Sequence, residues 1–137
     1  MSPAYISTTL RSLVRKRAQG RCEYCLLPEG VAFFRHEPDH ILALNHGGKT
    51  TDDNLALSCF DCNRFKGSDI ASMDPLSGAV VALFNPRTQD WHEHYASDNG
   101  RILPLTPTGR ATERLLKLNL SERVQVRWAL AERRQWG

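Results

Sequence analysis

Four cysteines constrain this chain more than any other feature of its sequence. They form two pairs, Cys22-x-x-Cys25 and Cys59-x-x-Cys62, with 33 residues between the pairs. Each Cys-x-x-Cys turn can direct two thiolates to one point, and two such turns complete the tetrahedral sulfur shell that Zn²⁺ prefers in closed structural sites. A redox-active pair or unrelated buried thiols are the alternatives, but no thioredoxin-like alternation of strands and helices is present. The pattern therefore predicts a structural zinc with no open position for chemistry.

Length and composition are typical of one soluble globular domain. The chain has 137 residues, of which 41% are apolar and 24% charged. No stretch approaches the roughly 20 apolar residues of a membrane span, and basic residues interrupt the apolar positions near the N-terminus, unlike a signal peptide. We therefore expect a cytoplasmic protein with no membrane contact, in which the thiols stay reduced and available for metal.

Charge is distributed unevenly, although the net charge is only +3. Residues 1–21 carry five basic and no acidic side chains, residues 22–100 five basic and twelve acidic, and residues 101–137 eight basic and three acidic. Basic ends suit a polyanion, because each neutralised phosphate releases counterions, and a carboxylate-rich middle suits a hard cation. Two solvated helix faces are the alternative interpretation.

Apolar periodicity and turn residues predict an α+β fold. Helical spacing predicts an N-terminal helix over residues 7–18, ended by Gly20. Strand-forming residues at 31–42 and a short apolar run at 55–57 predict two strands, joined by a polar loop at 45–53. The remaining expected elements are a helix from Cys59 to Lys66 ended by Gly67, a short strand at 79–84, and two helical segments near 110–118 and 122–134.

Short motifs rich in His, Asp, Asn and Gly lie between and just after the cysteine pairs. They are His36-Glu37-Pro38-Asp39-His40-Ile41, Gly47-Gly48, Asn54-Leu55-Ala56-Leu57 and Cys59-x-x-Cys62-Asn63-x-x-Lys66-Gly67. Together they resemble the HNH nuclease family over about residues 20–67. In this resemblance His40 is the first letter of the motif, Asn54 is the second, and Asn63 stands where a third His often lies.

The resemblance implies a ββα-metal (HNH, or His-Me finger) core at about residues 20–70, stapled by the zinc on Cys22, Cys25, Cys59 and Cys62. The tail also looks like that of small stand-alone bacterial HNH proteins. Its matching segments include Leu83-Phe84-Asn85-Pro86-Arg87 and Leu105-Thr106-Pro107-Thr108-Gly109-Arg110. We therefore expect a single domain over residues 1–137, with a loop-rich and helical extension at 71–137.

The motif residues suit the hydrolysis of a phosphodiester. A neutral His can take a proton from water near neutral pH, so His40 is the expected general base. The Asp39 carboxylate and the Asn63 amide oxygen are donors typical of a Mg²⁺ or Mn²⁺ site with open water positions. The family role of Asn54 is to tie the loop so that His40 is held in place, although an Asn at a loop exit is by itself more often a turn or cap.

One geometric condition follows from strand periodicity. Asp39 and His40 are consecutive, so on a regular strand their side chains face opposite sides of the sheet. Both can serve one site only if the chain bends there, and Pro38 together with the end of the strand favours such a bend.

Basic side chains outside the catalytic motif are candidate nucleic-acid contacts. Lys66 and Arg64 lie on the motif helix and could reach phosphates, with solvated surface charges as the alternative. In the two C-terminal helical segments we expect the apolar side chains to form the core and the arginines to form a face available to DNA. The apolar set is Leu115, Leu116, Leu118, Val124, Val126, Trp128 and Leu130, and the arginines are Arg110, Arg114, Arg123 and Arg127.

Taken together, these features predict an HNH endonuclease that hydrolyses DNA by a single-metal, His-general-base mechanism, with RNA as an alternative substrate. Family resemblance implies products with 5′-phosphate and 3′-hydroxyl ends. A zinc-containing nucleic-acid-binding module without catalysis is one rival, and a partner-dependent subunit of a defence or phage system is another. The oligomeric state is open, with a dimer as one option.

Overall fold

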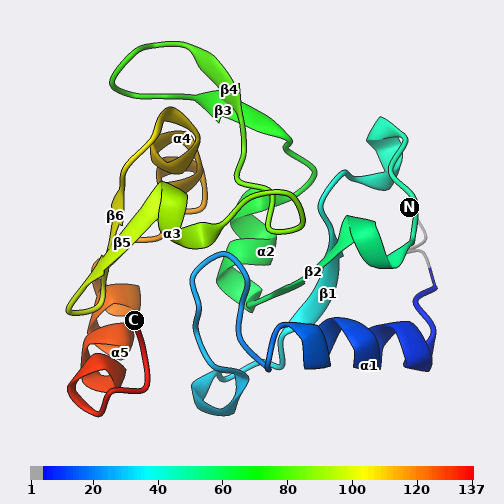
Figure 1. Cartoon of the computed structure of the whole chain (residues 1–137), viewed down its shortest axis with the longest axis horizontal. Helices are drawn as coiled ribbons and strands as arrows, with labels where there is room; N and C mark the ends of the chain where they lie inside the picture. The colour runs from blue at the N-terminus through cyan, green and yellow to red at the C-terminus, as the bar shows by residue number, and fades with distance from the viewer. Residues whose placement is uncertain (1–4) are drawn as a thin grey trace.

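The computed structural model describes residues 5–137, in which five α-helices and three two-stranded antiparallel sheets make a mixed α+β fold (Figure 1). The helices are α1 (Thr8–Arg17), α2 (Phe60–Lys66), α3 (Trp91–His94), α4 (Pro107–Leu115) and α5 (Ser121–Glu132). The strands are β1 (Glu37–His40), β2 (Leu55–Ser58), β3 (Ala71–Met73), β4 (Val80–Ala82), β5 (Tyr95–Asp98) and β6 (Arg101–Pro104). Three 3₁₀ turns lie at Glu29–Val31, Leu44–His46 and Asp52–Asn54. No helix of this described range is long and apolar enough to cross a membrane.

The predicted order of strand, strand and helix is confirmed at the centre of the fold. β1 pairs with β2, with Asp39 opposite Ala56 and His40 opposite Leu55, and α2 begins two residues after β2 ends. All four residues of β2 are buried, as expected of a strand covered on both faces. β1 is shorter than the predicted strand at 31–42, because residues 33–35 are exposed and unpaired.

The N-terminal helix forms where apolar spacing predicts it. The Ser7 Oγ caps α1 by accepting from the Leu10 N–H at 3.1 Å, and Val14 is completely buried. Val14 packs in a small core with Ile6, Leu55 and Leu57, so α1 covers one side of the β1–β2 hairpin (Figure 1). Burial of these side chains fixes the hairpin from below in that view.

The main core joins the cysteine pairs to the C-terminal extension. Its members include all four cysteines and buried aromatic side chains from distant parts of the chain. The Trp91 indole donates to the Tyr24 carbonyl and the Trp136 indole to the Cys25 carbonyl, each at 3.0 Å. Extension and motif therefore share one core, and the extension braces the first cysteine turn.

Two helices, α4 and α5, are present where the C-terminal segments were predicted. β4 lies within the predicted strand at 79–84 and pairs with β3. The β5–β6 hairpin was not predicted, because turn residues at Asn99-Gly100 and Pro104 read as loop. Asn99 and Gly100 both have positive φ and make the tight turn of that hairpin.

The predicted orientation of α5 is wrong except at Leu130, which is buried as expected. Arg127 is only 1% exposed and Arg123 is also buried, whereas Trp128 is 52% exposed. The Arg127 guanidinium donates to the Gly100 and Leu118 carbonyl oxygens at 2.7 and 2.6 Å and lies over the Trp136 ring. These bonds satisfy the buried charge, which hydrophobic periodicity alone cannot anticipate.

The expected arginine face of the tail is therefore dispersed. Arg110 makes a two-bond ion pair with the fully buried Asp74 carboxylate, at 2.8 and 3.0 Å, and so attaches α4 to the β3–β4 hairpin. Of the four arginines predicted to face DNA, Arg114 is the exposed one. Its guanidinium is available to a ligand, and the other three are structural.

Candidate functional site

The four cysteine sulfurs form one buried cluster. Their Sγ atoms all lie within 4.8 Å of one another, and Cys25 Sγ is 3.7 Å from Cys59 Sγ. A tetrahedral zinc with Zn–S bonds of about 2.3 Å places its sulfurs about 3.8 Å apart, so the cluster matches the donor set and the size. Burial raises the pKa of the Cys22 and Cys62 thiols, so zinc binding would displace protons from them. The predicted four-cysteine site is confirmed as a zinc-type arrangement.

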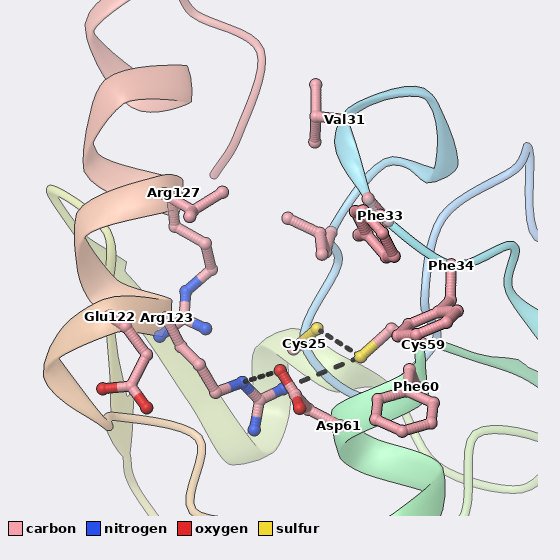
Figure 2. Close-up of a pocket in the computed structure, with 13 residues that line it drawn as sticks. Cys25, Val31, Phe33, Phe34, Cys59, Phe60, Asp61, Glu122, Arg123 and Arg127 are labelled. Atoms are coloured by element: carbon pink, nitrogen blue, oxygen red, sulfur yellow. Dashed lines mark hydrogen bonds and ion pairs between the residues drawn. The ribbon is translucent and has the colours of Figure 1, made fainter.

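A buried arginine from α5 touches this cluster. The Arg123 Nη2 donates to Cys62 Sγ at 3.0 Å. It also lies 3.7 Å from Cys59 Sγ (Figure 2). Its Nη1 donates to the Leu116 and Lys117 carbonyl oxygens, so the side chain is held on both sides. Four thiolates and one Zn²⁺ carry a net charge of about −2, and a guanidinium partly compensates it. Arg123 is a residue that the sequence interpretation assigned to the wrong surface.

The candidate catalytic hairpin begins with Asp39 on β1. Asp39 is half-buried, and its Oδ2 is a buried atom without a hydrogen-bond partner among residues 5–137. Burial raises the pKa of the Asp39 carboxyl, while the Lys66 ammonium and the His40 amide oppose that shift. Buried carboxylate oxygens are nearly always hydrogen-bonded or metal-bound, so this unpartnered atom fits a cation ligand.

Lys66 is not the surface residue that the sequence predicted. It is 2% exposed, and its Nζ donates to the His40 and Ile41 carbonyl oxygens at 3.3 and 3.2 Å. Burial lowers the pKa of Lys66, and the nearby Asp39 carboxylate counteracts this. Lys66 therefore joins α2 to the end of β1 and places a positive charge near Asp39, instead of reaching for phosphates.

His40 is half-buried at the end of β1. Its Nε2 lies 2.9 Å from the Thr50 Oγ1, in the loop between the two strands. This contact fixes the imidazole ring, and the hydroxyl can donate or accept according to the tautomer. Thr50 is a site residue that sequence reasoning missed, because a lone Thr in a polar loop carries no distinguishing signal.

The expected bend between Asp39 and His40 is absent. Pairing with β2 stays regular through His40, and the chain bends only at residues 41–42. The expectation that Pro38 favours a bend is wrong, because Pro38 occupies a regular register position opposite Leu57. Asp39 and His40 thus lie at the very end of the strand. Asp39 lies beside α2, and His40 lies beside the loop between β1 and β2.

Asn54 closes the loop that follows His40. Its Oδ1 accepts from the Leu42 N–H at 2.9 Å, and its Nδ2 donates to the Leu42 and Lys49 carbonyl oxygens at 2.9 and 2.8 Å. The two bonds to Leu42 join the exit of the loop to its entrance, and the bond to Lys49 holds its interior. This geometry is the loop tie that the resemblance implied for Asn54, and it holds the segment that carries Thr50.

Gly48 is required at the centre of the same loop. A Cβ there would lie 1.7 Å from the Leu42 carbonyl oxygen and 2.9 Å from the Asn54 Nδ2. We expect Gly48→Ala to lower Tm by roughly 5–10 °C, corresponding to about 2–3 kcal/mol of overpacking. Thermal unfolding followed by circular dichroism measures the change.

Gly30→Ala is the matched control for that substitution. A Cβ at Gly30 meets no atom within 4 Å, and its φ is not positive. It should leave Tm unchanged within about 2 °C, as for surface substitutions. Equal melting temperatures for the two variants would show that the loop is not held in the described way.

The remaining motif residues lie on α2. Asn63 is half-buried, one turn before Lys66. Arg64 is exposed, pairs with Asp61 at 3.3 Å and stacks over Phe65 at 4.3 Å. Asn63 thus lies on the helix that Lys66 attaches to the end of β1, whereas Arg64 stays accessible to a ligand.

A two-stranded antiparallel hairpin, a following helix and a four-cysteine cluster define a ββα module of the zinc-stapled type. Residues 22–69 match the family model described as HNH endonuclease. The match contains both cysteine pairs, β1, β2 and α2. Comparisons with curated proteins and with solved structures give no match. The resemblance predicted from the motifs is confirmed.

Proposed function

We propose that this protein is a metal-dependent endonuclease that hydrolyses phosphodiester bonds in DNA. The observation that carries the proposal is the buried, unpartnered Oδ2 of Asp39 in a segment of the HNH endonuclease family. A carboxylate left in this state costs free energy unless a cation binds it. A purely structural hairpin has no need of such a group.

Asp39 and Asn63 would hold a Mg²⁺ or Mn²⁺ ion. Both offer hard oxygen donors, which suit these cations and leave positions for water and phosphate. When bound, the cation would stabilise the charge that develops on the phosphate and on the departing oxygen. Lys66 keeps α2 against β1, and so keeps the two ligand-bearing elements together.

His40 would act as the general base that takes the proton from the attacking water. Thr50 orients the imidazole through its 2.9 Å contact, and Asn54 holds the loop that carries Thr50. Although the strand does not bend between Asp39 and His40, they occupy its last two positions, so a phosphate lying across the strand end could meet the two side chains from opposite faces. Prepositioning of this kind accounts for much of the rate enhancement of hydrolytic enzymes.

Exposed basic groups would contact the nucleic-acid backbone. Arg64 lies on α2 itself, and a groove of about 610 Å³ beside α1 is lined by Lys16, Arg35 and other polar side chains. Such contacts position a duplex without reading its sequence. RNA remains the alternative substrate for the same chemistry.

A supercoiled-plasmid assay tests the proposal. We expect the zinc-loaded chain to relax or linearise plasmid DNA with Mg²⁺ or Mn²⁺, and to be inactive when the divalent cation is omitted. EDTA should also stop cleavage, and zinc content is measured in parallel because EDTA can strip the cysteine site. Folded, zinc-loaded protein that shifts DNA in a gel but never cleaves it would contradict the proposal and favour a binding module or a partner-dependent subunit.

A further inference from the structure

Three phenylalanine rings form an exposed row beside the cysteine cluster. Phe33 is 94% exposed, and Phe34 and Phe60 are each about half-exposed at 51% and 50%. The Phe33 and Phe34 ring centroids are 4.9 Å apart, and those of Phe34 and Phe60 are 4.6 Å apart (Figure 2). Phe33 contributes almost nothing to the core, so the stability of the fold does not explain this row.

The row forms one wall of a groove of about 470 Å³, and α5 forms the opposite wall (Figure 2). The lining is mostly apolar, with the Asp61 and Glu122 carboxylates among the polar groups. The size and the aromatic wall suit a planar ring system. The Glu122 carboxylate can accept a hydrogen bond from the amino group of a nucleobase, whereas Asp61 is paired with Arg64 and Arg123.

One cation lies beside Phe60, and a second lies beside the neighbouring Phe65. The Arg64 guanidinium lies 5.6 Å from the Phe60 centroid and 4.3 Å from the Phe65 centroid, and the Lys117 Nζ lies 4.9 Å from Phe65. Rings that accept bases, next to cations that accept phosphates, are the combination by which proteins hold single strands. An apolar protein partner would have no use for this adjacent charge.

The row ends on α2, the helix that also carries the proposed metal ligand Asn63. Phe60 and Asn63 are three residues apart on α2, and side chains at this spacing are neighbours on a helix. A base stacked on Phe60 would therefore lie next to the residue proposed to hold the cation. In a duplex the bases are stacked on one another and cannot reach these rings.

We infer that Phe33, Phe34 and Phe60 form a stacking platform for unpaired nucleobases, which directs the site to single-stranded segments of its substrate. This inference rests on the proposed function, because it places the platform beside the phosphate to be cleaved. The recognised chemistry is the unpaired base, which single-stranded DNA and RNA share.

Binding measurements on a His40→Ala background test the platform without cleavage. Fluorescence anisotropy is recorded with short labelled single-stranded DNA, single-stranded RNA and duplex DNA. Adding Phe33→Ala should weaken single-strand binding about tenfold and change duplex binding less than about twofold. The fluorescence of 2-aminopurine placed in the single strand should be quenched by the parent and less so by the Phe33→Ala form.

Leu76→Ala is the control for removing an exposed apolar side chain. Leu76 is 76% exposed in the turn between β3 and β4 and does not line the groove. It should alter neither affinity nor quenching. Phe33 is almost fully exposed, so its replacement should leave the melting curve unchanged, and a drop in affinity then reports a lost contact.

Three results would overturn the inference. They are unchanged single-strand binding by Phe33→Ala, an equal loss on the duplex, and a dimer in sedimentation equilibrium that Phe33→Ala dissociates without affecting nucleic acid. The experiments test the stacking platform and the proposed nuclease activity separately. A chain that never cleaves plasmid but loses single-strand affinity with Phe33→Ala retains the platform, and a cleaving chain with unaltered affinity loses only the platform.

Discussion

His40→Ala is expected to slow plasmid cleavage by about 10²–10⁴-fold, the usual contribution of a positioned general base. The imidazole lies at the end of β1 and is held by Thr50, and neither β1 nor β2 carries another histidine. Removal of the ring leaves the cysteine cluster and both cores intact, so the folded protein should persist. Initial rates of nicking by zinc-loaded protein give the factor.

His46→Ala is the matched control for this loss. His46 is exposed, lies in the same loop and follows His40 by six residues. It should cleave at the wild-type rate, and both variants should melt with the parent. A full rate for His40→Ala, or an equal loss for His46→Ala, would show that His40 is not the base.

Cys59→Ser is expected to have the largest effect on stability. Structural zinc contributes an apparent ~10–16 kcal/mol in zinc-finger peptides near neutral pH, which equals or exceeds the ~5–15 kcal/mol that stabilises a typical domain. Cys59 also caps α2 and lies in the core shared with the extension. We therefore expect loss of bound zinc and of the cooperative melt, measured by metal analysis and circular dichroism.

A second variant tests the residues around the zinc site while leaving its four ligands in place. Arg123→Gln keeps all four sulfurs but removes the guanidinium 3.0 Å from Cys62 Sγ, and should weaken zinc affinity by about 10–100-fold, as outer-shell changes typically do. Competition with a chromophoric chelator measures that affinity. Arg114→Gln, on the exposed side of α4, should have no effect. Persistence of the fold in zinc-free Cys59→Ser protein would contradict a structural role for the metal.

The elements that could be predicted from the sequence are those whose structure depends on residues close together in the chain. The cysteine spacing, the apolar run of β2 and the position of Gly67 after Lys66 are enough to predict the hairpin, the helix and the metal cluster. The loop tie of Asn54 followed from the resemblance, and the structure shows the three bonds that make it.

The predictions failed for charged side chains that contacts with distant segments hold in the interior. Arg123 and Arg127 look like surface residues on an amphipathic helix, yet thiolates and carbonyl groups from distant segments satisfy them in the interior. Lys66 is buried for the same reason, because two carbonyl oxygens of the β1 end accept from its ammonium. Such partners cannot be deduced from spacing along one helix.

The central claim is that the end of β1 and α2 together hold a catalytic cation through Asp39. The most direct test is Mn²⁺ binding by zinc-loaded His40→Ala protein without nucleic acid, with free Mn²⁺ measured by electron paramagnetic resonance. Asp52→Asn, which removes an exposed carboxylate, is the control for nonspecific binding. We expect one Mn²⁺ to bind per chain, Asp52→Asn to keep it and Asp39→Ala to lose it. Equal binding with and without the Asp39 carboxylate would contradict the account.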